Sequence, residues 1–376
     1  MTNAQRKDST AMRESVLNER HRQLGSSLDG DTWNDMLIPW NYDTDPYDEV
    51  AVMRMRAGLF DVSGLHVANI RGADAEAVVD HLVSCDCTAL KPGQAAIGSE
   101  LNEQGHIVDD VMVIRDAADE FRLTHGEGET PQNLANSARG RDVQIEVDED
   151  THILSLQGPR SLAILDPHCD ADLAALKYFR HTPCTLFGRQ VIISRGGYSG
   201  ERGFEIYCAA ADAVDLWDTI LEKGAEHGVM PCSWTALDIS RIEAALLFFP
   251  FDMPQGDTTP WEINYGWSVS EKGEWRGKAA CLAARGKERF TQAGIVVQHD
   301  DAVEIGDRIF HDGKDVGRVN SPVYTQHLMQ SLALVHLDHG ASAIGTEVEV
   351  ESGGKRYAAR VVQTPFYDPM RLRTVG

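Results

Sequence analysis

The sequence predicts an α+β protein with two similar α+β lobes, each built on an antiparallel sheet, followed by a C-terminal β-barrel domain. Three observations lead to this fold class. A chain of 376 residues is long for a single core and suggests about two or three packed units. The order strand, helix, two strands and helix occurs twice before residue 285. From residue 290 onward, short segments rich in β-formers are separated by Gly and Asp turns, which is typical of a barrel.

The N-terminal 30 residues predict an extension that precedes the folded body. They are polar and lack the apolar core of a signal peptide. A charged stretch at 12–24 is compatible with a helix, and the folded body is expected to begin near Trp33. The expected division is therefore an extension at 1–30, a module of two interleaved α+β lobes at 31–285, and the barrel at 290–376.

The first lobe begins with residues 47–60, where apolar side chains at helical spacing predict a helix ending near Gly58. Residues 61–70 roughly alternate polar and apolar side chains and predict a strand. Asp74 is a suitable N-cap for a helix that runs to about Val83. The other elements expected here are a hairpin of strands at 99–101 and 107–114, a strand at 120–124 and a helix at 131–139.

The second lobe repeats this pattern, and the barrel follows it. The second lobe is expected to contain strands at 151–156, 190–194 and 203–208 and helices at 158–165, 211–227 and 234–247. The barrel is expected to contain strands at 294–297, 308–311, 317–319, 331–337, 347–350 and 357–363.

Composition excludes several classes of function. The net charge of −23 argues against a nucleic-acid surface, which needs Lys and Arg to neutralise phosphates, but it leaves room for a small anionic ligand. The seven cysteines contain no CxxC pair and the histidines no HExxH motif, so no metal site is expected. Scattered cysteines fit reduced thiols, and no apolar run reaches about 18 residues, which predicts a cytoplasmic protein without a membrane span.

Two adjacent acids, Asp109 and Asp110, begin an apolar run at 107–114. In a strand their side chains point to opposite faces, so one is expected to face solvent and the other to face inward. An inward carboxylate is costly unless it is paired or has a function. The alternative is an ordinary hairpin end.

The segment 196–206 combines four glycines with a carboxylate, Glu205, inside an apolar strand. Glycine lets a backbone approach a ligand closely, and a carboxylate suits a flat ring with amide and amine donors. The alternative is a glycine-rich turn. On the helix expected at 234–247, Arg241 could bind a carboxylate or form an internal ion pair.

Eight segments, in order along the chain, resemble motifs of the folate-binding T-protein (aminomethyltransferase) family. These segments are Gly58-Leu59-Phe60-Asp61-Val62-Ser63, Arg71-Gly72-Ala73-Asp74-Ala75, residues 105–113, Leu156-Gln157-Gly158-Pro159, residues 197–205, residues 238–244, residues 275–280 and residues 365–369. They span about residues 36 to 370. The resemblance implies a three-lobed ring around a folate channel, with tetrahydrofolate as co-substrate.

The resemblance also assigns roles to single residues. Asp110 falls on the functional aspartate of the family, which would face the reacting nitrogens of the folate. Tyr198 and Glu205 fall on pterin-binding positions and Arg241 on a folate-contacting position. Trp267 stands where the family often has an aromatic side chain near the cofactor, and His125 stands where it has a folate-contacting Asn.

Departures from the family pattern cluster where donor and folate should meet. The family's His-Met after "FDVS" is replaced by Gly64-Leu65, and residues 248–253 become aromatic. Aromatic residues that could form a hydrophobic donor pocket, or simply pack in the core, are Phe248, Phe249, Phe251, Trp261, Tyr265 and Trp267. The segment 36–42 is similar to the family's demethylases of aryl methyl ethers and of dimethylsulfoniopropionate.

Three hypotheses follow from this resemblance. The first is a demethylase that moves a methyl group from a small O-, S- or N-methylated donor to tetrahydrofolate. The second is the aminomethyltransferase of glycine cleavage, whose partner is a lipoylated carrier protein; the acidic charge disfavours docking of an acidic carrier. The third is a folate-binding protein without catalysis, against which Asp110 argues.

Overall fold

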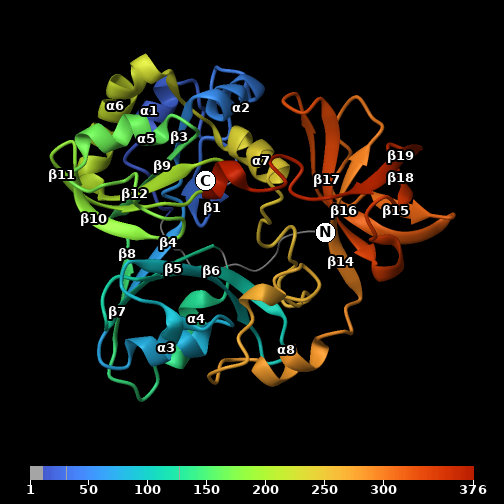
Figure 1. Ribbon diagram of the computed structural model, residues 1–376, viewed down its shortest axis with the longest axis horizontal. Coiled ribbons are helices and arrows are strands. Elements are labelled where there is room, and N and C mark those ends of the chain that lie inside the picture. Colours follow the sequence, from blue (N-terminus) through green and yellow to red (C-terminus); the bar gives the residue numbers. More distant parts are fainter. Residues whose placement is uncertain (1–11, 31, 127) are drawn as a thin grey trace.

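The structure, a computed structural model, describes residues 12–30, 32–126 and 128–376. Two α+β lobes and a β-barrel meet around the middle of the molecule, and the helix α7 (Trp234–Glu243) lies between them (Figure 1). The predicted fold class is confirmed, since both lobes contain mainly antiparallel sheets and the C-terminal domain is a closed six-stranded barrel.

The first lobe is a five-stranded antiparallel sheet of order β5-β6-β7-β4-β8, with two helices on one face (Figure 1). Its strands are β4 (His66–Arg71), β5 (Gln94–Leu101), β6 (Ile107–Arg115), β7 (Glu120–His125) and β8 (Gln144–Asp148). Its helices are α3 (Ala75–Leu82) and α4 (Thr130–Ser137). The apolar faces of these helices pack against the sheet, which leaves the other face of the sheet to the centre of the molecule.

The second lobe is a six-stranded sheet of order β10-β11-β12-β9-β3-β13. Its strands are β3 (Ala57–Asp61), β9 (Thr151–Gln157), β10 (His181–Leu186), β11 (Arg189–Ser194), β12 (Gly203–Ala209) and β13 (Val229–Pro231). Helices α1 (Asn18–Gln23), α5 (Ser161–Leu165) and α6 (Ala210–Gly224) accompany it, and α2 (Pro46–Met55) precedes it. β13 pairs in parallel with β3, so this sheet is not wholly antiparallel.

The barrel has the strand order β14-β17-β16-β15-β18-β19. Its strands are β14 (Phe290–Val297), β15 (Arg308–His311), β16 (Lys314–Thr325), β17 (Gln330–Asp338), β18 (Glu347–Ser352) and β19 (Lys355–Val362). The remaining elements are β1 (Thr32–Trp33), β2 (Met36–Leu37), α8 (Lys278–Ala284), α9 (Leu372–Val375) and short 3₁₀ turns at Cys87–Ala89, Asp166–His168, Ala225–His227, Gly266–Ser268 and His339–Ala341. Among the described residues, no helix is long and apolar enough to cross a membrane.

The helix predicted at 47–60 is too long at its C-terminal end. α2 ends at Met55, and Ala57–Asp61 form strand β3, in which every residue is buried. β3 lies between β9 and β13, so pairing with strands far along the chain overrides the local helical spacing. The helix predicted at 234–247 is also too long: α7 ends at Glu243, and Ala245 takes a left-handed backbone conformation (φ 51°) that a helix cannot contain.

Part of the predicted N-terminal extension belongs to the core. Leu17 and His21 are fully buried, and the His21 Nε2 lies 3.0 Å from Asp61 Oδ2. Ser15 Oγ donates to the same carboxylate oxygen at 2.6 Å. The expectation that the folded body begins near Trp33 is therefore wrong, because the charged stretch hides an apolar and hydrogen-bonded inner face.

A buried ion cluster around Arg54 joins the second lobe, α7, the barrel and the C-terminal segment. The Arg54 guanidinium donates to Glu243 Oε2 at 2.7 Å and lies 3.3 Å from Glu201 Oε1. Thr325 of β16 donates to the other oxygen of Glu243, and Tyr367 donates to Glu201 at 2.6 Å. This cluster fixes α7, which carries Arg241, against its neighbours.

Candidate functional site

A cavity of about 460 Å³ opens where the two lobes and the barrel meet. Strands β6 and β7 of the first lobe, β9, β11 and β12 of the second, helix α7 and strand β16 of the barrel all contribute side chains to its wall. Five of the six residues predicted to act in folate chemistry line it: Asp110, His125, Tyr198, Glu205 and Arg241. Segments more than 100 residues apart in the sequence are thus brought to one site.

Asp110 lies on β6 and faces the cavity, where it is half-buried. Among the described residues, its own backbone N–H is the donor that acts on this carboxylate, and no other side chain donates to it. Burial, together with the neighbouring Asp109 charge, raises the pKa of Asp110 to about 7. A carboxylate with a raised pKa and without a side-chain donor, at a cavity wall, is typical of a functional group.

Asp109 does not reach solvent, so the expectation that one acid of the pair faces solvent is wrong. It points to the opposite face of β6 and is fully buried, because α4 covers that face of the sheet. Thr130 Oγ1, at the start of α4, lies 2.6 Å from Asp109 Oδ2. The backbone N–H of Asp110 donates to Asp109 Oδ1 at 2.9 Å. The acid pair therefore divides between the cavity and a buried network behind it.

Glu205 on β12 lines another part of the wall and has Ser155 and Ser194 as its cross-strand neighbours. Tyr207 donates a hydrogen bond to its carboxylate at 3.3 Å. Burial raises the pKa of Glu205 to about 6, a shift that the Tyr207 hydrogen bond partly offsets. Glu205 keeps acceptor capacity for a ligand, because a carboxylate has two oxygens and about four lone-pair sites.

The glycine-rich segment is mainly a packed turn. A side chain at Gly197 or Gly203 would collide with the amide of Gln157, and one at Gly200 would meet Ala244. Only Gly196 has open space around its Cα and borders the cavity without such a neighbour. The buried Gln157 itself donates to Ser155 Oγ at 2.9 Å and accepts from Ser199 at 2.7 Å. Tyr198, within the turn, lines the cavity, and its hydroxyl donates to the Leu247 carbonyl at 2.5 Å.

Arg241 lines the cavity, but most of its donors serve internal partners. Its Nε donates to Asp238 at 2.8 Å and its Nη1 to Asp252 at 2.6 Å. The Leu246 carbonyl accepts from Nη1 at 3.3 Å and Ser321 of the barrel from Nη2 at 2.9 Å. Since a guanidinium has five N–H groups, about one remains for a ligand.

His125 ends β7 beside the cavity and stacks on His66 with ring centroids 5.2 Å apart. Its Nδ1 lies 2.9 Å from the Gly126 carbonyl and 3.5 Å from Asp109 Oδ2. The ring therefore connects the cavity wall to the network behind Asp110. Burial, followed by the charges of His125 and Arg13, lowers the pKa of His66 to about 4, so His66 is neutral at physiological pH.

Trp267 is not brought to the cavity. Its side chain is 67% exposed, and its ring packs on Tyr265, which does line the wall, at 5.8 Å between centroids. Of the other aromatic candidates, Phe248, Phe249 and Phe251 line the cavity, whereas the indole N–H of Trp261 donates to the Cys281 carbonyl outside it. Four of the six candidates thus surround the cavity.

Three tryptophans complete an aromatic end of the cavity that the sequence reasoning missed. Trp33 lies 5.0 Å from Trp234 and 6.2 Å from Phe248 between ring centroids, and Trp40 lies 6.2 Å from Trp234. Backbone hydrogen bonds from Trp234 and Thr235 to residues 39 and 40 hold the N-terminal segment on α7. No local pattern reveals this contact, because it depends on packing across about 200 residues of sequence.

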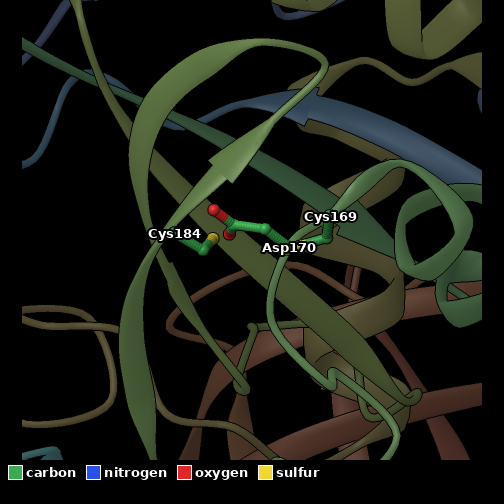
Figure 2. Close-up of side chains that lie close together, drawn as sticks. All are labelled: Cys169, Asp170 and Cys184. Atoms are coloured by element: carbon green, nitrogen blue, oxygen red, sulfur yellow. The ribbon is translucent and has the colours of Figure 1, made fainter.

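One group of possible metal ligands occurs among the described residues, at the outer edge of the second lobe. Figure 2 shows the Asp170 carboxylate directed toward Cys184, with Cys169 beside it. The group offers three ligand atoms, one fewer than a structural zinc ion takes. Asp170 also accepts the N–H of Thr185 at 2.7 Å, and burial raises the pKa of the Cys184 thiol, which disfavours the thiolate that a metal needs. We therefore assign no metal to it.

Comparison with protein families identifies the architecture around this cavity. Residues 17–273 match the GCVT N-terminal domain, and residues 291–368 match the glycine cleavage T-protein C-terminal barrel domain. The chain belongs to the glycine cleavage T-protein family. Enzymes of this family bind tetrahydrofolate and transfer one-carbon units.

Individual members of the T-protein family are similar along almost the whole chain. The gamma subunit of a heme-dependent oxidative N-demethylase from Ectopseudomonas mendocina is 39% identical over 369 residues, covering 96% of this chain and 97% of the subunit. An aminomethyltransferase from Bacillus subtilis is 33% identical over 351 residues, covering 91% and 95%. The crystal structure of the Bartonella henselae aminomethyltransferase superimposes with a TM-score of 0.87 at 27% identity, covering 96% and 99%.

Proposed function

We propose that this protein is a tetrahydrofolate-dependent one-carbon transferase, a demethylase that moves a methyl group from a small O-, S- or N-methylated donor to tetrahydrofolate. The observation that carries the proposal is Asp110, a carboxylate to which no described side chain donates, in a cavity with an aromatic end. An N-methylated donor is favoured, because the 39% identical relative is named as a subunit of an N-demethylase. We place this activity in the cytoplasm.

Tetrahydrofolate fits the groups that the cavity presents. Its pterin ring is flat and carries amide and amine N–H donors, which suit the free acceptor positions of Glu205. Tyr198 and the open backbone at Gly196 border the same wall and would contact the ring. The glutamate tail is anionic, and the remaining N–H of Arg241 would attract it.

The chain's own residues supply orientation, charge and exclusion of water. When bound, tetrahydrofolate supplies the amine nitrogen that accepts the carbon. Asp110 orients this nitrogen and stabilises positive charge that develops there. The aromatic end formed by Trp33, Trp234 and Phe248 receives the donor and excludes water, which favours alignment of the two reactants.

A second candidate is aminomethyl transfer from a lipoylated carrier protein, which the 33% identity to the Bacillus subtilis aminomethyltransferase supports. The two candidates differ in the donor that must reach the aromatic end of the cavity. A protein-borne donor arrives on a long arm, whereas a small methylated molecule is enclosed.

One assay tests both candidates. Purified protein is incubated with tetrahydrofolate and a panel of N-methylated amines, aryl methyl ethers and dimethylsulfoniopropionate, with an aminomethyl-loaded lipoylated carrier in parallel. Mass spectrometry then distinguishes 5-methyltetrahydrofolate from methylenetetrahydrofolate. 5-Methyltetrahydrofolate from a small donor supports the demethylation proposal, because transfer of an intact methyl group needs no oxidant. Product from the carrier alone favours the aminomethyltransferase.

Replacing Glu205 with Gln should weaken tetrahydrofolate binding by about 10- to 100-fold, because a hydrogen bond to a charged group contributes about 1.5–3 kcal/mol. The measurement is a calorimetric titration with tetrahydrofolate. Glu222→Gln, at a side chain that is 72% exposed on α6, is the matched control and should bind normally. Unchanged affinity in Glu205→Gln would remove Glu205 from the pterin site.

The pH dependence of catalysis should follow Asp110. Its pKa is raised to about 7 by burial and by Asp109, and only the ionised carboxylate stabilises positive charge. kcat/KM, which reports the free enzyme, should therefore rise with pH through about 7 and level off above it. A profile that is flat between about pH 5.5 and 8.5 would contradict this role.

A further inference from the structure

Two carboxyl groups lie side by side behind Asp110, on the face of the first-lobe sheet that α4 covers. Glu100 of β5 and Asp109 of β6 are direct cross-strand partners, and both are fully buried. Like charges directly opposite each other in a sheet are destabilising. Two ionised carboxylates in this position would also pay a large desolvation cost.

Thr130 bridges the two carboxyl groups. Its Oγ1 lies 2.7 Å from Glu100 Oε2 and 2.6 Å from Asp109 Oδ2. A hydroxyl group carries one proton, so it can donate to only one of these oxygens. The other contact is a hydrogen bond only if that carboxyl group is protonated and donates to Thr130 Oγ1. The geometry therefore favours one shared proton and a single negative charge on the pair.

The surroundings favour the negative charge on Asp109 and the proton on Glu100. Asp109 accepts the backbone N–H of Asp110 and has His125 Nδ1 at 3.5 Å. Among the described residues, the side-chain donors to Glu100 are Thr130 and the neutral Asn133 amide. Two titratable groups act on Glu100: Asp109 raises its pKa and His125 lowers it. Burial has a larger effect than either charge and raises the pKa of Glu100 to about 7.

We propose that Glu100, Thr130 and Asp109 form a proton-sharing unit that controls the negative charge next to Asp110. In the resting arrangement Glu100 donates to Thr130 Oγ1, and Thr130 donates to Asp109. If the Glu100 proton passes to Thr130 while the Thr130 proton passes to Asp109, the charge moves to Glu100 and no proton is gained or lost. Because Asp109 opposes ionisation of Asp110, this shift favours the ionised Asp110 that the reaction needs.

Two variants mimic the two arrangements. In Glu100→Gln, the new amide can donate to Thr130 and still accept from Asn133, which fixes the charge on Asp109. In Asp109→Asn, the new amide can donate to Thr130 and still accept from the Asp110 N–H, which fixes the charge on Glu100. Glu103→Gln, at an exposed turn of the same hairpin, is the matched control.

The protonation of Glu100 is tested by the pH dependence of stability, without any activity measurement. A carboxyl group whose folded pKa lies above its unfolded value stabilises the fold at low pH and loses this contribution as pH rises. For Glu100 the window runs from about 4.5 to about 7. Between about pH 5 and pH 8, the melting temperature of Glu100→Gln should therefore rise relative to that of the wild type, while Glu103→Gln shows no such trend. A constant difference, or a trend of opposite sign, would overturn the proposal.

The effect on Asp110 rests on the proposed function and is tested by kinetics. The acid-side midpoint of kcat/KM should stay near the wild-type value in Glu100→Gln and shift to lower pH in Asp109→Asn. Equal midpoints in the two variants would overturn the control of Asp110. If Asp109→Asn does not fold, an infrared titration of the wild type should show a protonated-carboxyl band that Glu100→Gln lacks, and its absence would likewise overturn the proposal. Failure of every donor in the transfer assay leaves the stability and infrared results valid, so the two proposals fail separately.

Discussion

Replacing Asp110 with Asn should lower kcat/KM for one-carbon transfer by about 100- to 1,000-fold, a loss of roughly 2.7–4 kcal/mol of transition-state stabilisation. Asn has nearly the same shape as Asp but cannot carry the negative charge that faces the reacting nitrogen. Since no other described side chain donates to Asp110, and the Asn oxygen can still accept from the residue's own backbone N–H, the substitution breaks no hydrogen bond to another residue. The folate dissociation constant should change by less than about 3-fold, which separates a catalytic role from a binding role.

Steady-state kinetics and a folate titration on the same preparation test this expectation. The variant should also be at least as stable as the wild type at neutral pH, because the raised pKa of Asp110 shows that its ionised form opposes folding. Asp312→Asn, at a side chain that is 88% exposed on the barrel, is the control. Full transfer activity in Asp110→Asn would mean that another group stabilises the reaction.

The sequence identified residues that line the cavity where they belong to a recognisable motif. It missed residues that reach the cavity only through packing. Strand alternation alone placed Asp109 and Asp110 on opposite faces, and the family resemblance singled out Asp110. The sequence could not show that α4 buries Asp109 or that Glu100 lies beside it, because both contacts depend on sheet register and helix packing. For the same reason the family resemblance points to Trp267 as the aromatic residue near the cofactor, whereas Tyr265, two residues earlier, is the one that lines the cavity.

The fold shows the same difference between elements that local patterns predict and elements that distant contacts decide. Period-2 segments in the barrel predicted six strands that correspond to β14 to β19, the last of them extending one residue beyond Val362. The errors fall where a partner far along the chain decides the conformation, as in β3, which is inserted between β9 and β13. The N-terminal segment is another case, since its charged residues concealed a face that packs on Asp61. Local periodicity cannot report such pairings.

The Arg54 cluster was also invisible in the sequence, and it leads to the largest expected effect on stability. Arg54→Met should lower the free energy of unfolding by about 3–5 kcal/mol, because it removes one partner of a buried ion pair. Arg54 and Glu243 have side chains that are 1% and 0% exposed. Without Arg54, the one side-chain donor left to the Glu243 carboxylate among the described residues is Thr325. The measurement is denaturant unfolding of both proteins.

A comparison of variants separates this cause from the loss of packing. If an unpaired Glu243 charge is responsible, adding Glu243→Gln to Arg54→Met should recover part of the lost stability, although Glu243→Gln alone destabilises the wild type. Arg71→Met, at a surface pair whose side chains are 49% and 68% exposed, should cost less than about 1 kcal/mol. Additive effects of Arg54→Met and Glu243→Gln would show that the two charges do not stabilise each other. Because the cluster connects α7 to the second lobe, the barrel and the C-terminal segment, Arg54→Met should also loosen Arg241 and weaken folate binding.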